Sequence, residues 1–144
     1  MAVIAQASTH AKHMFASKQI DLPNDDLYIV LMKPTLVFDK NIHGTFADVS
    51  THELDDGFGY TQGGELLTNS GLVEDLVSSK SYIVARQNLW TANGGVLGVI
   101  GSYLIYNNTL PDKTVMGHVG FDGYTYSIPD GMSFLVRETI ISLV

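Results

Sequence analysis

The sequence reads SYIVARQNLWTANGGVLGVIGSYLIYN from Ser81 to Asn107, and this stretch decides the fold class. It contains two runs rich in β-branched and aromatic residues, Ser81–Trp90 and Val96–Asn107. Residues of these types favour β-strands, and the Asn93-Gly94-Gly95 segment between the runs is typical of a turn. We therefore predict two strands joined by a turn in the middle of the chain.

Further short apolar runs, with turn signals between them, lie on both sides of this stretch. The other predicted strands are Leu27–Met32, Leu66–Asn69, Val115–Phe121 and Ser133–Leu143. The later turn signals are Asn107-Asn108, Pro111-Asp112, Asp122-Gly123 and Pro129-Asp130-Gly131. Short strands at this spacing predict a mainly β protein, an antiparallel β-sandwich or jelly-roll-like fold with one N-terminal helix.

The N-terminal segment has a helical spacing of apolar residues. They recur every three or four positions between Ile4 and Met14, which is the period of a helix with one buried face. We predict a helix over residues 6–18 that packs on the sandwich, preceded by residues 1–5 as an arm that reaches another subunit. One further short helical turn is predicted within Phe46–Leu54.

Two of the predicted strands have apolar residues on both faces. Leu27–Met32 is apolar throughout, whereas a strand with one wet face alternates apolar and polar residues. In the other strand, Val99, Tyr103 and Ile105 are predicted on one face and Ile100, Leu104 and Tyr106 on the opposite face. Such strands are either covered on both sides within the chain or packed against another subunit. The covered arrangement is favoured, because the N-terminal helix can cover one face.

The composition excludes several classes of function. The 144 residues include no cysteine, which rules out disulfides and thiol nucleophiles. Eight Lys and Arg against fifteen Asp and Glu give a net charge of −7, so an interaction with nucleic-acid phosphates is not expected. The uncharged stretch between Arg86 and Asp112 is interrupted by asparagines and is too polar to span a membrane. We predict one soluble domain over residues 1–144, without a targeting signal at its start.

Residues that could carry chemistry form only weak patterns. His10 and His13 would share a helix face, and His52 and Glu53 form a second cluster with Asp55 and Asp56. Neither supplies the four nitrogen or sulfur ligands of a structural zinc site, and we find no phosphate-binding or nucleophile motif. We therefore expect solvated, turn or capping roles for these residues, no metal or cofactor, and no enzymatic activity. A hydrolase that uses His52 or Asp55 is the alternative.

Five parts of the sequence, taken in order, carry a resemblance to a known family. They are Ala11–Ala16 with Ile20–Asp25, Gly57–Leu67, Trp90 before Gly94-Gly95, Tyr103–Asn107, and Met116–Val119. In these parts, which span most of the chain, the sequence resembles small virion structural proteins of tailed bacteriophages. Residues 34–56 and 122–132 depart from the resemblance.

The resemblance implies a non-enzymatic, β-rich subunit of the virion, which assembles in the host cytoplasm. The expected role is a capsid decoration or cement protein that stabilises the lattice of the major capsid protein. An accessory role in the neck or tail is one alternative. A small carbohydrate-binding β-sandwich is another, and its candidate platforms are the aromatic residues Trp90, Tyr124 and Tyr126.

We also expect a homo-oligomer, a dimer or a trimer, because some strands are apolar on both faces. A sheet with one face in solvent needs only one apolar face, and the surplus face can pack against another subunit. A stable interface between subunits usually buries at least about 1,000 Å². The expected contact residues come from the N-terminal segment and the first strand. They are Val3, Ile4, Lys12, Tyr28, Val30 and Met32.

Overall fold

The computed structural model describes residues 4–137 and 139–143 of the chain. Its elements are β1 (Ile4–Ala7), α1 (Thr9–Ala16), β2 (Leu27–Met32), α2 (Phe46–Val49), η1 (Ser50–His52), β3 (Glu65–Leu66), β4 (Asn69–Asp75), β5 (Lys80–Ala85), β6 (Asn88–Thr91), β7 (Leu97–Ile100), β8 (Ser102–Asn107), β9 (Val115–Gly120), β10 (Tyr126–Ile128), β11 (Ser133–Val136) and β12 (Thr139–Leu143). The strand pairs of the described residues are antiparallel. The predicted fold class, mainly β with antiparallel sheets, is confirmed.

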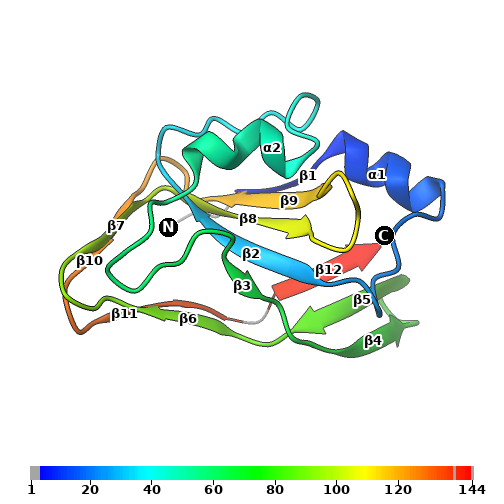
Figure 1. The fold of residues 1–144 in the computed structure, drawn as a ribbon. Coiled ribbons are helices and arrows are strands. Elements are labelled where there is room, and N and C mark those ends of the chain that lie inside the picture. Colours follow the sequence, from blue (N-terminus) through cyan, green and yellow to red (C-terminus); the bar gives the residue numbers. More distant parts are fainter. Residues whose placement is uncertain (1–3, 138, 144) are drawn as a thin grey trace.

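The strands form two layers that face each other like the halves of a sandwich (Figure 1). The first layer is a five-stranded sheet with the order β1-β9-β8-β2-β3. The second layer contains the three-stranded sheet β12-β5-β4 and the pair β11-β6. The pair β10-β7 lies at one end, where the chain passes from one layer to the other (Figure 1).

The main core lies between the two layers. Ile29 and Leu31 of β2 and Ile105 of β8 belong to the same buried cluster as Trp90 of β6 and Val136 of β11. Each large apolar side chain that is fully buried contributes about 1.5–3 kcal/mol relative to an exposed one. This cluster therefore supplies much of the energy that holds the layers together.

A second cluster covers the outer face of the five-stranded sheet. Val30 and Met32 of β2 and Leu104 of β8 pack there against Leu36 and Val49. The segment that contains α2 runs across this face (Figure 1). The central strands are thus covered on both faces within the chain, as the favoured interpretation of their sequence predicts. Their cover comes from residues 34–49 and not from the N-terminal helix.

Helix α1 is shorter than predicted and begins at Thr9. Ser8 is its N-cap, because the Ser8 side chain accepts a hydrogen bond from the Ala11 N–H at 3.0 Å. The partly buried ring of Phe15 packs against the main core. In the described part of the chain, no helix is long and apolar enough to cross a membrane.

Residues 4–7 form a strand, so the helix predicted over 6–18 is wrong at its start. Strand β1 pairs with β9 in a register that places Ile4 opposite Gly120 and Ala7 opposite Gly117. Without β1, the backbone N–H and C=O groups on that edge of β9 would have no strand partner, and pairing satisfies them. Residues 4 and 5, which were predicted in the arm, therefore belong to the sheet of their own chain. Residues 1–3 lie outside the described residues.

The predicted strand over Val96–Asn107 is divided in two at Gly101. Strand β7 ends before this glycine and β8 begins after it, so the alternation of faces is interrupted. A Cβ atom at Gly101 would lie 2.5 Å from the Cα of Pro34, which means that only glycine allows this close approach. As a result Ile100 lies in the main core with Ile105, and not on the face of Leu104 as predicted.

Candidate functional site

The structure does not bring the predicted interface residues together on one exposed surface. Lys12 is exposed on α1, and Tyr28 is half-buried with its ring stacked on Tyr106 at 5.8 Å between ring centroids. Val30 and Met32 are both 0% exposed in the outer cluster. Their side chains are covered by residues 34–49 of the same chain, which corrects their prediction as contact residues. Val3 and the Ile4 side chain lie outside what the structure describes.

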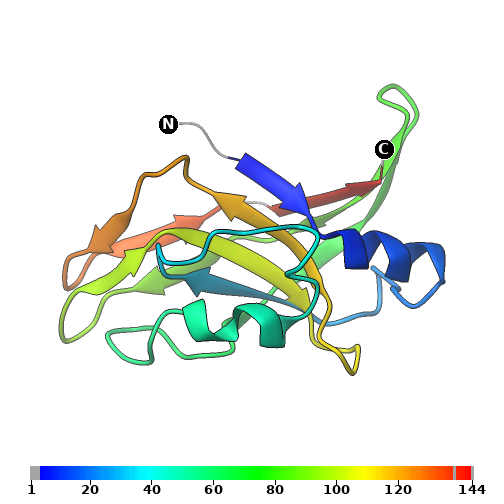
Figure 2. The ribbon, with the colours of Figure 1, turned by 90° about the horizontal axis from the view of Figure 1, so that it is seen from above.

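Two adjacent apolar side chains at the tip of the β4–β5 hairpin are among the most exposed of the described residues. Leu76 is 81% exposed and Val77 is 97% exposed. The Asp75 carboxylate accepts hydrogen bonds from the Val77 and Ser78 N–H groups at 3.0 and 3.1 Å, which holds the turn. Figure 2 shows this hairpin extending past the rest of the molecule. The tip thus presents two apolar side chains in a defined conformation.

A second exposed apolar surface lies on the outer side of the β6–β11 pair. Leu89 of β6 and Leu135 of β11 are directly opposite each other in the register. They are 48% and 40% exposed, because the neighbouring residue Trp90 faces the core instead. A strand with a wet outer face usually carries polar residues there. The second layer therefore exposes apolar side chains in two places, at the tip of the β4–β5 hairpin and on the outer face of the β6–β11 pair.

The cluster predicted around His52 is dispersed by the fold. Glu53 points into the protein, where it accepts hydrogen bonds from the Tyr60 hydroxyl at 2.6 Å and the Gly63 N–H at 2.7 Å. Burial raises the pKa of the Glu53 carboxyl. His52 is bonded to the Thr35 hydroxyl instead, at 2.9 Å. Glu53 thus links its loop to Tyr60.

The remaining members of the predicted clusters also have separate partners. Asp55 forms an ion pair with Lys33 at 3.1 Å. His10 Nε2 lies 2.7 Å from a carboxylate oxygen of Asp112, and the centroids of the His10 and His13 rings are 6.4 Å apart. Across the residues that the structure describes, there is no group of three or more His, Asp or Glu side chains placed to hold a metal.

The three aromatic residues considered as sugar platforms have different environments. Trp90 is only 2% exposed and lies in the main core, so it is not accessible to a ligand. Tyr126 packs against the rings of Phe121 and Phe134. Tyr124 alone of the three is largely exposed, at 60%.

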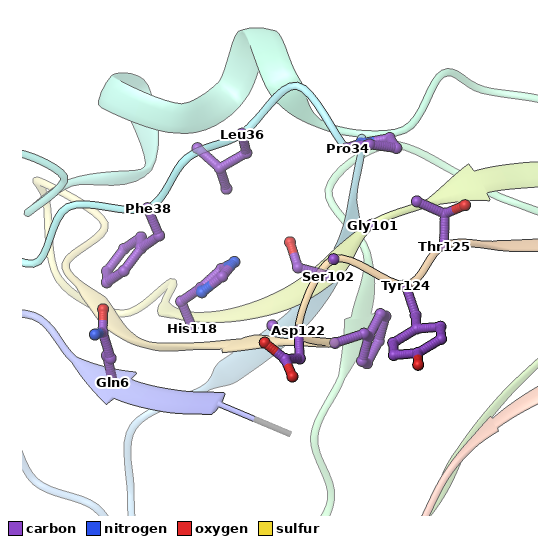
Figure 3. A pocket seen from close by; sticks show the side chains of 13 residues that line it. Gln6, Pro34, Leu36, Phe38, Gly101, Ser102, His118, Asp122, Tyr124 and Thr125 are labelled. Carbon is purple, nitrogen blue, oxygen red and sulfur yellow. The ribbon is translucent and has the colours of Figure 1, made fainter. Parts of the chain in front are cut away.

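A cavity of about 380 Å³ lies on the outer face of the five-stranded sheet, next to Tyr124 (Figure 3). It forms because the paired residues Ser102 of β8 and Gly120 of β9 have little side-chain volume. Space therefore remains between the sheet and the segment that covers it. The lining residues are Gln6, Pro34, Leu36, Phe38, Gly101, Ser102, His118, Gly120, Phe121, Asp122, Gly123, Tyr124 and Thr125.

His118 forms one wall of the cavity. It pairs with Leu104 in the sheet and so faces the outer side, where the Phe38 ring stacks on it with 4.7 Å between centroids. Burial, assisted by the nearby His43, lowers the pKa of His118 to about 4. The imidazole is therefore uncharged at neutral pH.

Two buried polar atoms at this cavity lack a hydrogen-bond partner. They are Ser102 Oγ and His118 Nε2, neither of which has a partner among the described residues. Ser102 is 4% exposed, and the side chains of both residues point towards the space below Leu36 (Figure 3). Buried polar groups are nearly always paired. Ser102 Oγ and His118 Nε2 are thus both available to a molecule in the cavity.

Sequence reasoning missed this cavity. Ser102 and His118 are sixteen positions apart in the sequence (118 − 102 = 16), and no catalytic or ligand-binding motif joins them. The one local signal was the presence of Gly101 and Gly120 in otherwise bulky strands. Whether two small residues face each other depends on the strand register, which no local pattern shows.

Comparison with known proteins identifies no relative: no family model, no curated protein and no solved structure matches the chain.

We expect the protein to lose stability in mild acid because of His118. In the unfolded chain this histidine gains a proton near pH 6.5, whereas in the folded protein it does so only near pH 4. The unfolded state therefore binds more protons in this window, and the free energy of unfolding falls by up to about 3 kcal/mol as the pH decreases from 6.5 to 4. Urea unfolding at a series of pH values measures this loss.

A His118→Gln variant is the control for this prediction. Glu53 acts in the opposite direction, because its raised pKa lets the folded state hold a proton more tightly than the unfolded state. This contribution is the same in both proteins and cancels in their difference. Parallel curves of stability against pH for the two proteins would show that His118 does not carry the effect.

Proposed function

We propose that the protein is a non-enzymatic structural subunit of a tailed-phage virion, a capsid decoration or cement protein that binds the lattice of the major capsid protein. The sequence resemblance supports this role. The observation that carries the proposal is the β4–β5 hairpin, whose apolar tip of Leu76 and Val77 extends into solvent. A subunit that attaches to a lattice needs such an accessible apolar contact.

The tip can supply part of the energy that attaches the protein to a lattice. Burial of two large apolar side chains contributes about 1.5–3 kcal/mol each. Together they could strengthen binding by about a hundredfold or more, since each 1.4 kcal/mol corresponds to a factor of ten. The hydrogen bonds that Asp75 accepts hold the turn before binding, which reduces the entropy lost on contact.

We expect the double variant Leu76→Ser, Val77→Ser to bind phage heads at least about a hundredfold more weakly than the unchanged protein. The measurement uses heads assembled without the protein, to which each purified protein is added at increasing concentration before sedimentation. Because binding stabilises the state that is bound, decorated heads should also have a higher melting temperature than bare heads.

Val37→Ser provides a matched control. Val37 is 83% exposed, but it lies in the segment over the first layer, away from the hairpin. Both variants should keep their stability within about 0.5 kcal/mol, because the substituted side chains have few contacts in the fold. Equal binding of the double variant and the unchanged protein would contradict the role of the hairpin. If the unchanged protein is found in necks or tails and not on heads, the alternative of an accessory role in the neck or tail is favoured.

Sedimentation of the isolated protein tests the proposed homo-oligomer. If the hairpin tip also joins copies of this chain, the unchanged protein sediments as a dimer or trimer and the double variant as a monomer. A monomer in both cases would restrict self-association to the particle surface. The partner that we propose for the tip is the capsid lattice. A dimer or trimer that the double variant abolishes would show instead that the tip binds a second copy of this chain.

A further inference from the structure

We infer that the cavity beside His118 binds a neutral polyhydroxy ligand, of the size of one sugar ring. This inference is independent of the capsid role, because it concerns the first layer and the isolated protein. The cavity volume of about 380 Å³ falls in the range of small-molecule sites, about 300–1,000 Å³. Its lining combines apolar and polar side chains, and those of Ser102 and His118 point to one space (Figure 3).

The buried polar groups at the base of the cavity match hydroxyl groups. Ser102 Oγ can donate and accept a hydrogen bond. In neutral His118, Nε2 either donates or accepts one, depending on the tautomer. Neither atom is paired with another described residue. A ligand hydroxyl is itself a donor and an acceptor, so it satisfies both partners whichever tautomer His118 adopts. The fold thus leaves two hydrogen-bonding positions for which a polyhydroxy molecule is suited.

The charges around the cavity exclude anionic ligands. Among the described lining residues there is neither Lys nor Arg, and Asp122 contributes a carboxylate. A phosphate or carboxylate would therefore enter without a positive partner and would be repelled by Asp122. The same carboxylate accepts hydrogen bonds well, which again favours a ligand with several hydroxyl groups.

The rim of the cavity supplies a surface for the apolar face of a ring. Tyr124 is 60% exposed, and it lines the cavity together with Asp122. Gln6 and Thr125 add an amide and a hydroxyl at other points of the lining. An exposed aromatic ring beside hydrogen-bonding groups suits the C–H face and hydroxyl edge of a sugar ring.

The test uses the full-length protein and four sugars separately, namely glucose, galactose, mannose and N-acetylglucosamine at millimolar concentration. We expect at least one sugar to shift the NMR signals of the His118 ring and the Gly101 and Gly120 amides, and to receive saturation transfer from the protein. If none of the sugars shifts these signals, the inference is overturned. Binding of tetramethylammonium in place of the sugars would also overturn it, because Asp122 with Tyr124 would then be a cation site.

Ser102→Ala separates binding from folding. Because the Ser102 hydroxyl has no partner in the described structure, its removal should leave the melting temperature unchanged or raised. Sugar binding should nevertheless weaken at least tenfold, and Tyr124→Ala should weaken it as well. If Ser102→Ala lowers the melting temperature and leaves binding unchanged, the hydroxyl has a structural role and the inference is wrong.

Ser8→Ala is the matched control, since it makes the same substitution at another buried serine. Ser8 Oγ donates to the Val115 carbonyl and accepts from the Ala11 N–H. Its loss should lower the melting temperature and leave sugar binding unchanged, the reverse of the result expected for Ser102. Equal behaviour of the two variants would overturn the assignment of Ser102 as a binding residue.

Discussion

Trp90→Ala should lower the free energy of unfolding by about 3–5 kcal/mol, the usual cost of truncating a large aromatic side chain in a core. Trp90 is 2% exposed, and the centroid of its ring lies 6.3 Å from that of Phe134. The substitution leaves a cavity between the layers that the neighbouring strands cannot fill. Circular dichroism is the appropriate measure of unfolding, because Trp90 is the only tryptophan and its fluorescence is lost with it.

Tyr124→Ala is the matched aromatic control for this experiment. Tyr124 is 60% exposed, so its loss should change the free energy of unfolding by no more than about 0.5 kcal/mol. A small effect of Trp90→Ala would mean that its ring is not packed in the core. In that case the reading of Trp90 as an accessible sugar platform would return.

Gly64→Ala should destabilise the protein by more than about 4 kcal/mol, a cost that few single substitutions reach. A Cβ atom at this position would lie 2.1 Å from the Ile29 carbonyl oxygen and 2.7 Å from a Val30 methyl carbon. Both belong to β2, which is paired on both sides and buried, so the contact cannot relax by a simple side-chain rotation. Thermal and urea unfolding measure the loss, or show that the variant does not fold.

Gly63→Ala separates this clash from the cost of the backbone conformation. Gly63 and Gly64 both have a positive φ, of 95° and 79°, but nothing lies within 4 Å of a Cβ at Gly63. Its substitution should cost only the strain of the left-handed conformation, about 1–2 kcal/mol. Equal losses for the two variants would show that the approach of residue 64 to β2 is unimportant.

The sequence alone was sufficient for the fold class and the buried strands. Leu27–Met32 could be recognised as covered on both faces because the information lies in the composition of six consecutive residues. The short helical turn within Phe46–Leu54 was also predictable, and α2 is found there. Such features depend on neighbours in the chain, which a sequence shows directly.

The tertiary structure decided the properties that depend on pairing between distant segments. Residues 4–7 have a helical spacing of apolar residues, yet they form a strand because the edge of β9 offers backbone hydrogen bonds. The cover of the outer face comes from residues 34–49, which have no amphipathic period of their own.

The candidate sites likewise required the tertiary structure. Ser102 and His118 share a cavity only through the register of β8 and β9, and the tip of the β4–β5 hairpin is exposed only because of where its sheet ends. The periodicity of a sequence predicts which residues are buried. Strand register and the close approach of separate segments arise from contacts across the fold, so they determine where a cavity and an exposed apolar tip are left.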